Sequence, residues 1–283
     1  MPGRRLLVLD AYAPEGRAAL REAGGTEAGV LYERLLRRLD PAAVIDVAYP
    51  ADPDPRLPSG AALGDYDGVV WTGSSLTILD GEDPRVRRQV DFARAVYTAG
   101  IPSFGSCWAA QLAVVAAGGR CRASPRGREF GISRRIELSA AGREHPLFEG
   151  RPAVFDAFTS HADEVAELAD AHLLASNDWS RVQAVSVAQD GGRFWAVQYH
   201  PEYDLHEVAS LCRLRADELV AQGSFESRAA AERWAEQLEA LHADPSRADL
   251  ADALGVGRDL LDPEQRTREV ANWLRSVGGF RRS

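Results

Sequence analysis

The feature that most constrains the fold of this chain is a sharp turn at Gly105-Ser106-Cys107, between a predicted strand and a predicted helix. An apolar run at residues 101–104 reads as a buried strand, and residues 108–117 read as a helix of small residues. A cysteine at the start of a helix faces unpaired N–H groups and the positive end of the helix dipole, which favour the thiolate. The turn therefore predicts a strand–helix unit with a nucleophile at Cys107. A buried structural thiol is the alternative interpretation.

The alternation of strand and helix patterns extends through the first half of the chain. Strands are predicted at residues 6–9, 44–48, 68–71 and 101–104, and helices at residues 31–39, 84–99 and 108–117. This alternation predicts the α/β class, with a mostly parallel central sheet and helices on both faces. Shorter, mixed strands are predicted at residues 128–138, 153–158, 173–175, 182–187 and 194–199. Later runs are helical, near residues 205–222, 226–242 and 263–276, with a linker at 242–246.

A second motif, His200-Pro201-Glu202, follows the last predicted strand. Side chains in a strand repeat every two residues, so extended backbone through Pro201 would project His200 and Glu202 to the same side. The carboxylate could then orient the imidazole, which could take a proton from Cys107 and return it to a leaving amine. The two motifs predict a Cys–His–Glu catalytic triad. Ligands of open parallel sheets bind beyond the carboxyl ends of the strands, so one pocket could collect these residues.

These motifs resemble those of class I glutamine amidotransferases, and most of all the stand-alone proteins similar to the glutaminase domain of GMP synthase. The nucleophile motif of that family, Gly-x-Cys-x-Gly-x-Gln, matches at Gly105, Cys107 and Gln111 and departs at Ala109. Its His-Pro-Glu motif matches at residues 200–202. Two further matches, the strand and glycine turn at residues 68–74 and the segment at residues 160–163, follow in the family's order. The resemblance covers residues 4–205.

The resemblance implies roles for residues outside the triad. Gly73 or Ser74, together with Trp108, would supply backbone N–H groups to an oxyanion hole. The implied contacts to the amino acid end of glutamine, largely through backbone groups, are made by Gln111, Ser160, His161, Ala162 and Asp163. The implied amidotransferase domain spans residues 1–205, and residues 206–283 would form a helical extension packed on it. No metal or organic cofactor is required for this chemistry.

Three positions modify this expectation. Ala109 replaces a glycine that lets helix and strand approach closely, and we expect the site to survive because a methyl group is small. Asp10 and Tyr12 end the first predicted strand near the pocket rim, where they could select the distal part of a substrate.

The expected reaction is hydrolysis of the γ-amide of glutamine through a γ-glutamyl thioester, after which ammonia passes to a separate synthetase. The second hypothesis is a γ-glutamyl peptide or γ-glutamyl amine hydrolase that acts alone, for which bulky Trp71 and Trp108 could line a wider acceptor region. The third is a catalytically silent binding or regulatory protein, which the intact triad motifs disfavour.

The composition excludes other classes of enzyme. All 33 basic residues are arginine, so the chain has no P-loop lysine, no lysine for a Schiff base with pyridoxal phosphate and no Ser–Lys dyad. A net charge of −9 gives no general attraction to nucleic acid. The three cysteines are widely spaced and lack metal-site spacing, which favours a reducing compartment. With too short an apolar N-terminus for a signal peptide and no predicted membrane span, we expect a cytoplasmic protein.

Overall fold

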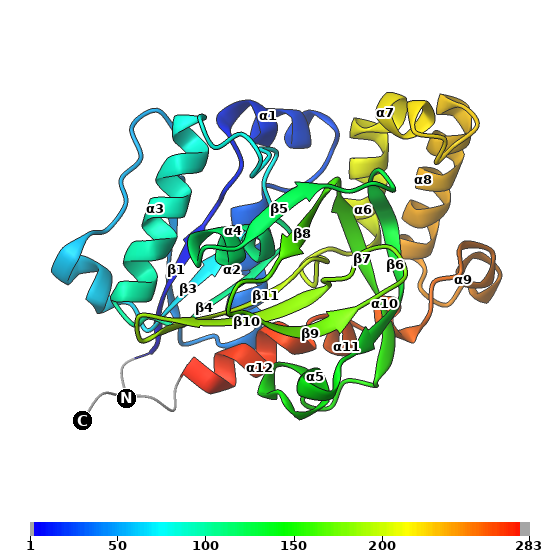
Figure 1. The fold of residues 1–283 in the computed structure, drawn as a ribbon. Helices are drawn as coiled ribbons and strands as arrows, with labels where there is room; N and C mark the ends of the chain where they lie inside the picture. Colours follow the sequence, from blue (N-terminus) through cyan, green and yellow to red (C-terminus); the bar gives the residue numbers. More distant parts are fainter. Residues whose placement is uncertain (1–2, 278–283) are drawn as a thin grey trace.

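The computed structural model describes residues 3–277, which contain a nine-stranded central sheet in the order β2-β1-β3-β4-β11-β10-β9-β6-β7 (Figure 1). Five neighbouring strands run parallel, namely β2 (Val44–Ala48), β1 (Arg5–Leu9), β3 (Gly68–Trp71), β4 (Ser103–Ser106) and β11 (Gly192–Val197). The sheet continues with the antiparallel strands β10 (Ala184–Gln189), β9 (His172–Ser176), β6 (Glu129–Leu138) and β7 (Val154–His161). A separate antiparallel pair is formed by β5 (Arg120–Ala123) and β8 (Asp163–Glu167). The predicted α/β class is confirmed.

Helices cover both faces of the parallel strands because side chains alternate along each strand. In β1, Leu7 and Leu9 join a core cluster with α3 (Pro84–Thr98) and α4 (Trp108–Ala116). On the other face, Leu6 and Val8 join a cluster with α2 (Ala28–Leu39) and α12 (Arg268–Val277). Figure 1 shows α12 along the lower side of the sheet. Strands buried on both faces explain why β1 and β3 read as almost continuous apolar runs.

The contact between α12 and the sheet centres on Trp273, whose side chain is 1% exposed. Its ring lies 6.0 Å from the ring of Phe104 in β4, measured between centroids. A Cβ atom at Gly68 would lie 3.0 Å from the Trp273 ring, so the start of β3 is a position where a side chain would displace the indole. Burial of an aromatic side chain of this size stabilises the fold by about 1.5–3 kcal/mol. The last helix therefore completes one face of the core.

A third core cluster joins helices from both ends of the chain at the antiparallel end of the sheet (Figure 1). Its helices are α1 (Pro14–Glu22), the start of α2, α6 (Leu205–Leu214), α7 (Ala216–Ala221), α8 (Arg228–Ala243), α9 (Ala248–Leu254) and α10 (Arg258–Leu261). The remaining short elements are α5 (Ala140–Glu144), α11 (Pro263–Arg266) and the 3₁₀ turns η1 (Gly60–Asp65) and η2 (Pro146–Phe148).

The observed elements differ from the predicted ones mainly at their ends and in short segments. The helices α1, α5, α9 and α10 and the β5–β8 pair were not predicted. The predicted helix at residues 205–222 divides at Arg215, and the predicted linker at residues 242–246 overlaps the end of α8. The last strand of the parallel set ends at Val197 rather than at residue 199, which changes the backbone that carries the second motif.

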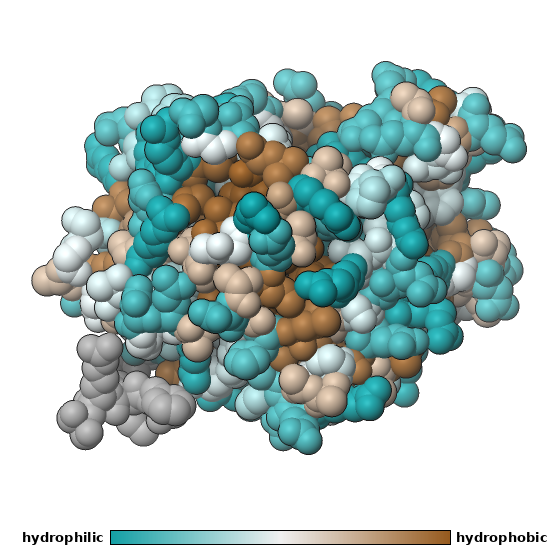
Figure 2. Space-filling model, viewed as in Figure 1, coloured by the Kyte–Doolittle hydropathy of each residue, from teal (hydrophilic) through white to brown (hydrophobic). Residues whose placement is uncertain are grey.

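The face of the molecule drawn in Figure 2 is mainly hydrophilic, with hydrophobic residues gathered between α3 and the β5–β8 pair. Within residues 3–277, every helix is too short or too polar to cross a lipid bilayer.

Candidate active site

Cys107 occupies a sharp turn between β4 and α4. Its backbone angles, φ 53° and ψ −102°, lie at positive φ, which is rare for a residue with a side chain and costs of order 1–3 kcal/mol. The backbone N–H of Cys107 donates to the carbonyl of Val197 in β11 at 2.8 Å, which holds this conformation. The sulfur lies 3.7 Å from the carbonyl oxygen of Ser160. The turn thus presents the thiol at the carboxyl ends of β4 and β11.

The departure from the family motif at Ala109 is accommodated by the glycine that precedes the turn. A Cβ atom at Gly105 would lie 2.4 Å from the Cβ of Ala109 and 2.5 Å from the carbonyl oxygen of Trp71. The space on the strand side is therefore filled by the Ala109 methyl group, which is fully buried. Helix and strand still meet closely, with the side chain on the helix and the glycine on the strand.

His200 and Glu202 form a buried ion pair, with 2.7 Å between His200 Nδ1 and Glu202 Oε1. The prediction that extended backbone brings them together is wrong. β11 has already ended, and the N–H of Tyr203 donates to the carbonyl of His200 at 3.3 Å, which closes a turn over Pro201. The turn places both side chains on one side, as an extended segment would have done. Ser106 Oγ donates to the same carboxylate oxygen at 2.8 Å.

The surroundings of His200 favour its protonated form. Burial lowers the pKa of this imidazole, but the neighbouring Glu202 carboxylate and the Cys107 side chain raise it more, to about 10. The Cys107 side chain acts both through charge and as a hydrogen-bond partner. The His200 ring also stacks on Tyr203, with centroids 3.9 Å apart and planes 4° from parallel. An imidazolium held in one orientation next to the Cys107 sulfur is suited to give a proton to a leaving group.

The Gly73–Ser74 turn faces the same histidine. A Cβ atom at Gly73 would lie 2.9 Å from His200 Cε1, so glycine leaves the space that the ring occupies. Thr72 Oγ1 donates to the carbonyl of Gly73 at 2.7 Å, and Ser74 Oγ donates to the carbonyl of Ala11 at 2.8 Å. In a trans peptide the N–H points opposite to the C=O, so the N–H of Ser74 points away from Thr72. These bonds fix the orientation of the turn next to Cys107.

The segment matched at residues 160–163 spans the end of β7 and the start of β8. Ala162 lies between the two strands, and the carbonyl of Asp163 accepts a hydrogen bond from Gln111 Nε2 at 3.0 Å. The Asp163 carboxylate accepts one from Thr77 Oγ1 at 2.6 Å. These bonds link α4, the start of β8 and the turn that follows Gly73, so they give the cavity one fixed wall.

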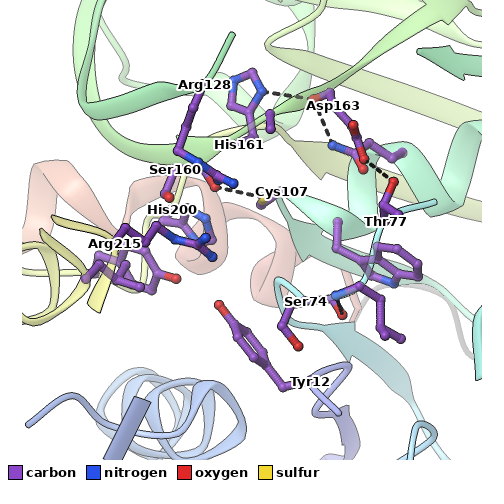
Figure 3. Close-up of a pocket in the computed structure, with 17 residues that line it drawn as sticks. Tyr12, Ser74, Thr77, Cys107, Arg128, Ser160, His161, Asp163, His200 and Arg215 are labelled. Atoms are coloured by element: carbon purple, nitrogen blue, oxygen red, sulfur yellow. Dashed lines mark hydrogen bonds between the residues drawn. The ribbon is translucent and has the colours of Figure 1, made fainter. Parts of the chain in front are cut away.

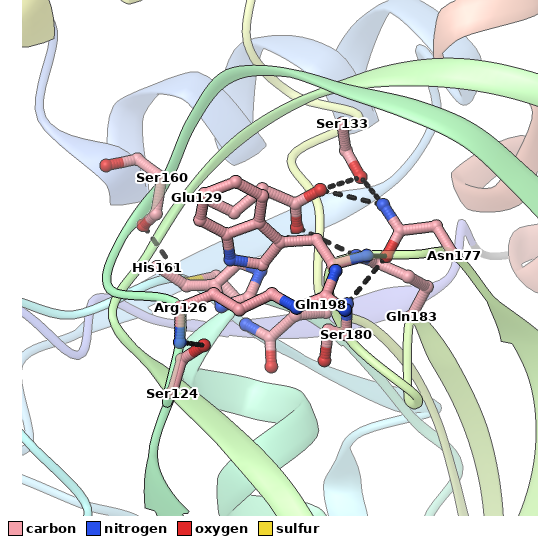
Figure 4. A network of polar contacts seen from close by, with 12 residues as sticks. Ser124, Arg126, Glu129, Ser133, Ser160, His161, Asn177, Ser180, Gln183 and Gln198 are labelled. Carbon is pink, nitrogen blue, oxygen red and sulfur yellow. Dashed lines mark hydrogen bonds and ion pairs between the residues drawn. The ribbon is translucent and has the colours of Figure 1, made fainter. Parts of the chain in front are cut away.

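The ring of His161 belongs to a buried polar network that sequence reasoning missed (Figure 4). His161 Nε2 lies 2.8 Å from Glu129 Oε2, and His161 Nδ1 lies 2.9 Å from the carbonyl oxygen of Asp163. Glu129 also accepts hydrogen bonds from Ser133, Asn177 and Gln183. No local signal could have indicated this network, because Glu129 and His161 face each other across the β6–β7 pair.

A cavity of about 200 Å³ brings most of the predicted site residues together (Figure 3). The predicted residues among its lining are Tyr12, Ser74, Cys107, Trp108, Gln111, Ser160, His161, Ala162, Asp163 and His200. Gly73 contacts the cavity residue His200, and Glu202 lies behind that ring. Two arginines that were not predicted, Arg128 and Arg215, also line the cavity.

Asp10 and Trp71 lie elsewhere than the sequence suggested. Asp10 is fully buried, where its carboxylate accepts hydrogen bonds from the N–H groups of Gly29 and Tyr12. Burial raises the pKa of Asp10 to about 6. Trp71 belongs to the core between α3, α4 and the sheet and stacks on Phe194. Of the two tryptophans proposed for an acceptor region, Trp108 lines the cavity. Within residues 3–277, no cluster of three or more His, Cys, Asp or Glu side chains is arranged to hold a metal ion.

The chain is similar to a family model and to several known proteins. The family model for glutamine amidotransferase class-I matches residues 61–212. A gamma-glutamyl-L-1-hydroxyisopropylamide hydrolase of Pseudomonas is 34% identical over 275 residues, which cover 95% of this chain and 92% of that protein. A glutamine-hydrolyzing GMP synthase of Yersinia pestis is 32% identical over 141 residues, which cover 48% of this chain but 25% of that protein. This chain therefore matches about a quarter of the synthase.

Solved structures share the fold at low sequence identity. A glutamine amidotransferase from Thermotoga maritima superimposes with a TM-score of 0.67 at 15% identity, over 98% of this chain and 99% of that one. A glutamine amidotransferase from Methylobacillus flagellatus gives a TM-score of 0.63 at 18% identity, over 100% of this chain and 97% of that one. With a family model that matches more than half of the residues and a relative aligned over nearly the whole length, the chain belongs to the class I glutamine amidotransferase family.

Proposed function

We propose that this protein hydrolyses γ-glutamyl amides, with Cys107 as nucleophile, His200 as general acid and base, and Glu202 as the carboxylate that orients His200. The observation that carries the proposal is the meeting of these side chains at one cavity. His200 Nδ1 lies 2.7 Å from Glu202, and the other side of the imidazole interacts with the Cys107 side chain. No metal or organic cofactor takes part in the proposed reaction.

The first half of the reaction forms a thioester. The Cys107 thiolate attacks the γ-carbonyl carbon, and the negative charge moves to the carbonyl oxygen. The His200 imidazolium then gives its proton to the amide nitrogen, the C–N bond breaks, and the amine leaves. The Glu202 carboxylate stabilises the imidazolium until this proton transfer.

The second half releases glutamate. Neutral His200 takes a proton from water, and the resulting hydroxide attacks the thioester carbon. The C–S bond breaks, glutamate leaves, and the thiolate and imidazolium are restored.

The oxyanion of both steps would be held by backbone N–H groups of Trp108 and of Gly73 or Ser74. Trp108 is the first residue of α4, where N–H groups lack helix partners. Ser74 N–H is directed away from Thr72 by the hydrogen bond of the preceding carbonyl. Loss of one such donor typically costs about a hundredfold or more in rate. Gln111 and residues 160–163 would hold the amino acid end of the substrate.

A hydrolase that acts alone is favoured by the relative from Pseudomonas, which matches this chain over almost its entire length. The name of that relative describes a γ-glutamyl amide with an organic leaving amine. The second candidate function, a glutaminase that passes ammonia to a separate synthetase, is favoured by the similarity to the glutaminase-sized part of GMP synthase.

The test incubates the purified chain with glutamine and with γ-glutamyl-p-nitroanilide, and compares wild type with Cys107→Ala. We expect the wild type to hydrolyse both substrates and the rate of Cys107→Ala to be lower by about 10³-fold or more. Cys121→Ala is the matched control, because burial raises the pKa of the Cys121 thiol to about 12 and keeps it protonated. Hydrolysis that survives in Cys107→Ala would overturn the proposed chemistry. Glutamine hydrolysis that needs a synthetase partner would favour the second candidate function.

Covalent labelling separates the three cysteines directly. A glutamine-analogue electrophile should modify Cys107 and leave Cys121 and Cys212 unmodified, since burial raises the pKa of both other thiols to about 12. Mass spectrometry of the labelled peptides gives the site.

A further inference from the structure

Two arginines line the active-site cavity without a role in the proposed chemistry. Arg128 precedes β6, and Arg215 lies between α6 and α7. The Arg128 side chain is 12% exposed and the Arg215 side chain is 21% exposed. Arg215 lies beyond residues 61–212, which match the family model. These arginines come from segments far apart in the sequence and reach the same cavity.

Both guanidinium groups share one carboxylate. Arg128 Nε donates to Glu218 Oε1 at 2.9 Å, and Arg215 Nη1 donates to Glu218 Oε2 at 3.1 Å. Burial raises the pKa of Glu218, but the two guanidinium groups outweigh it and hold that pKa below its usual value. Two positive charges and one negative charge leave the group with a single net positive charge.

Arg128 and Arg215 have N–H groups that do not contact Glu218 and could bind a ligand. Each guanidinium has five N–H groups, and the contact with Glu218 uses one nitrogen of each. Arg215 Nε is buried and has no hydrogen-bond partner among the described residues. The donors left for a ligand are therefore other guanidinium nitrogens of Arg128 and Arg215, both of which line the cavity.

The arginine pair lies on the side of the cavity from which the amine would leave. Figure 3 shows Asp163 and Thr77 on one side of Cys107, and Arg128 and Arg215 on the other, beside His200. The proton donor to the leaving nitrogen is His200 in the proposed mechanism, so the amine departs toward that side.

Two further hollows share lining residues with the cavity on this side. A neighbouring hollow of about 270 Å³ shares Tyr12, Ser75 and Arg215 with the active-site cavity. A larger hollow of about 620 Å³ shares Arg128 with it. Each arginine thus lies between the active-site cavity and a second hollow.

We propose that Arg128 and Arg215 bind a carboxylate on the leaving amine, so that the preferred substrates are γ-glutamyl amides of amino acids. The inference rests on the proposed hydrolase function and names its substrate class. A carboxylate matches the single net positive charge of the group and the planar fork of a guanidinium. Bound there, it would hold the leaving nitrogen next to His200.

The first test uses wild-type enzyme and two amides that differ only in the leaving group. One is γ-glutamyl-L-alanine, and the other is the γ-glutamyl amide of L-2-aminopropan-1-ol, in which a hydroxymethyl group replaces the carboxylate. We expect kcat/KM to be about 10- to 100-fold higher for the alanine amide, because charge-assisted hydrogen bonds are about twice as strong as neutral ones. Equal or reversed values would overturn the inference.

The second test compares variants through the ratio of the two kcat/KM values. Arg215→Gln and Arg128→Gln should each reduce the preference for the carboxylate by about tenfold. Arg213→Gln is the matched control, since Arg213 lies on α6 and pairs with Glu232 and Glu239 away from the cavity. The control should keep the wild-type ratio. If the arginine variants lower kcat/KM equally for both amides, the two arginines contact the glutamyl end of the substrate and the inference is overturned.

A failure of this inference differs from a failure of the proposed function. If both amides are hydrolysed at equal rates and both need Cys107, the hydrolase function stands and the carboxylate site does not. If neither amide nor glutamine is hydrolysed, the proposed function itself fails. If the arginine variants do not fold, inhibition of the wild-type enzyme by the two leaving amines tests the inference instead. We expect L-alanine to inhibit at about tenfold lower concentration than L-2-aminopropan-1-ol.

Discussion

Two buried His–Glu pairs line or support the same cavity, yet their surroundings suit them to different tasks. In one pair His200 uses Nδ1 for Glu202, which leaves the rest of the ring to face Cys107. In the other, both ring nitrogens of His161 have partners within the protein, Glu129 and the carbonyl of Asp163. A histidine with both nitrogens engaged has none left for a reacting atom.

The carboxylates differ in the same way. Glu202 Oε1 accepts hydrogen bonds from His200 and Ser106, close to the nucleophile. Glu129 is the centre of a network that ties β6 and β7 to the segment between β9 and β10. The comparison teaches that the same two residue types can serve different tasks. In the proposed mechanism, the pair whose histidine faces Cys107 orients a proton carrier, whereas the pair enclosed by other polar side chains stabilises the fold. Substitutions in the two pairs should therefore act on different measurements.

Glu202→Gln should have the largest effect on the reaction. Without the carboxylate charge the His200 imidazolium loses its main stabilising partner, so kcat should fall by about 10²- to 10⁴-fold. Steady-state kinetics with γ-glutamyl-p-nitroanilide gives the value. Glu239→Gln is the control, because Glu239 pairs with His206 at 2.9 Å outside the cavity lining. An unchanged kcat in Glu202→Gln would contradict the proposal that the His200–Glu202 pair acts in the reaction.

Glu129→Gln should act mainly on stability. The new amide group would face donors from His161, Asn177 and Gln183, so at least one buried donor loses its acceptor. We expect the free energy of unfolding to fall by about 2–4 kcal/mol, measured by urea denaturation. The exposed Glu137 of the same strand is the control, and Glu137→Gln should change stability by less than about 0.5 kcal/mol. A stable Glu129→Gln with abolished kcat would assign this pair to catalysis instead.

Gly73→Ala should disturb the His200 pair alone. The added methyl group would lie 2.9 Å from His200 Cε1 and push the ring out of line with Cys107. We expect kcat to fall by about 10- to 100-fold, since small displacements of reacting groups have effects of this size. Gly64→Ala is the matched control, as a Cβ atom there meets no atom within 4 Å. Loss of activity in both variants would point to a general effect on folding.

The two pairs should also respond at opposite ends of the pH scale. The pKa of His200 is raised from 6.5 to about 10, so its contribution to stability is fully present below pH 6.5 and is lost as the pH rises through 10. Burial raises the pKa of Glu129, but the hydrogen bonds from its partners lower it below 4.5 overall. Its contribution is present above pH 4.5 and is lost as the pH falls.

Urea denaturation of wild type, Glu129→Gln and Glu202→Gln at acid and alkaline pH separates the contributions of the two pairs to the free energy of unfolding. The stability difference between wild type and Glu129→Gln should shrink in acid, and that for Glu202→Gln should shrink in alkali. The reverse pattern would contradict the assignment of charge to the two pairs.

Ala109→Gly should have the smallest effect and touches neither pair. Glycine in a helix costs about 1 kcal/mol, and the site changes only by one methyl group opposite Gly105. We expect glutamine turnover to stay within about threefold of wild type. A large increase would indicate that the native alanine adapts the enzyme to another substrate.

Local sequence was sufficient for those parts of the site that local geometry creates. The strand–turn–helix at Cys107 follows from an apolar run, small residues and a helical run that are contiguous in the chain. His200 and Glu202 are two residues apart, so the prediction that they pair is independent of whether the backbone is extended or turned. The prediction of extended backbone was wrong because Pro201 and the Tyr203 N–H close a turn there.

The parts that the sequence could not indicate depend on contacts between distant segments. Strand register sets Glu129 opposite His161, and a slip of one strand by one residue would place the two side chains on opposite faces of the sheet. Arg128 and Arg215 meet at Glu218 only because α7 lies near the start of β6. From sequence alone, charged residues on a loop and at a helix end are expected to lie on the solvated surface, and only the fold shows that these two line a cavity.

The amino-acid sequence by itself determined the α/β class, the family and the turn that carries Cys107, since these rest on patterns and motifs that short stretches of chain contain. Tertiary structure alone decided which of two His–Glu pairs faces Cys107, which tryptophan reaches the cavity and which arginines line it. The physical reason is that burial, charge and hydrogen-bond partners belong to positions in space, and segments far apart in the chain supply them.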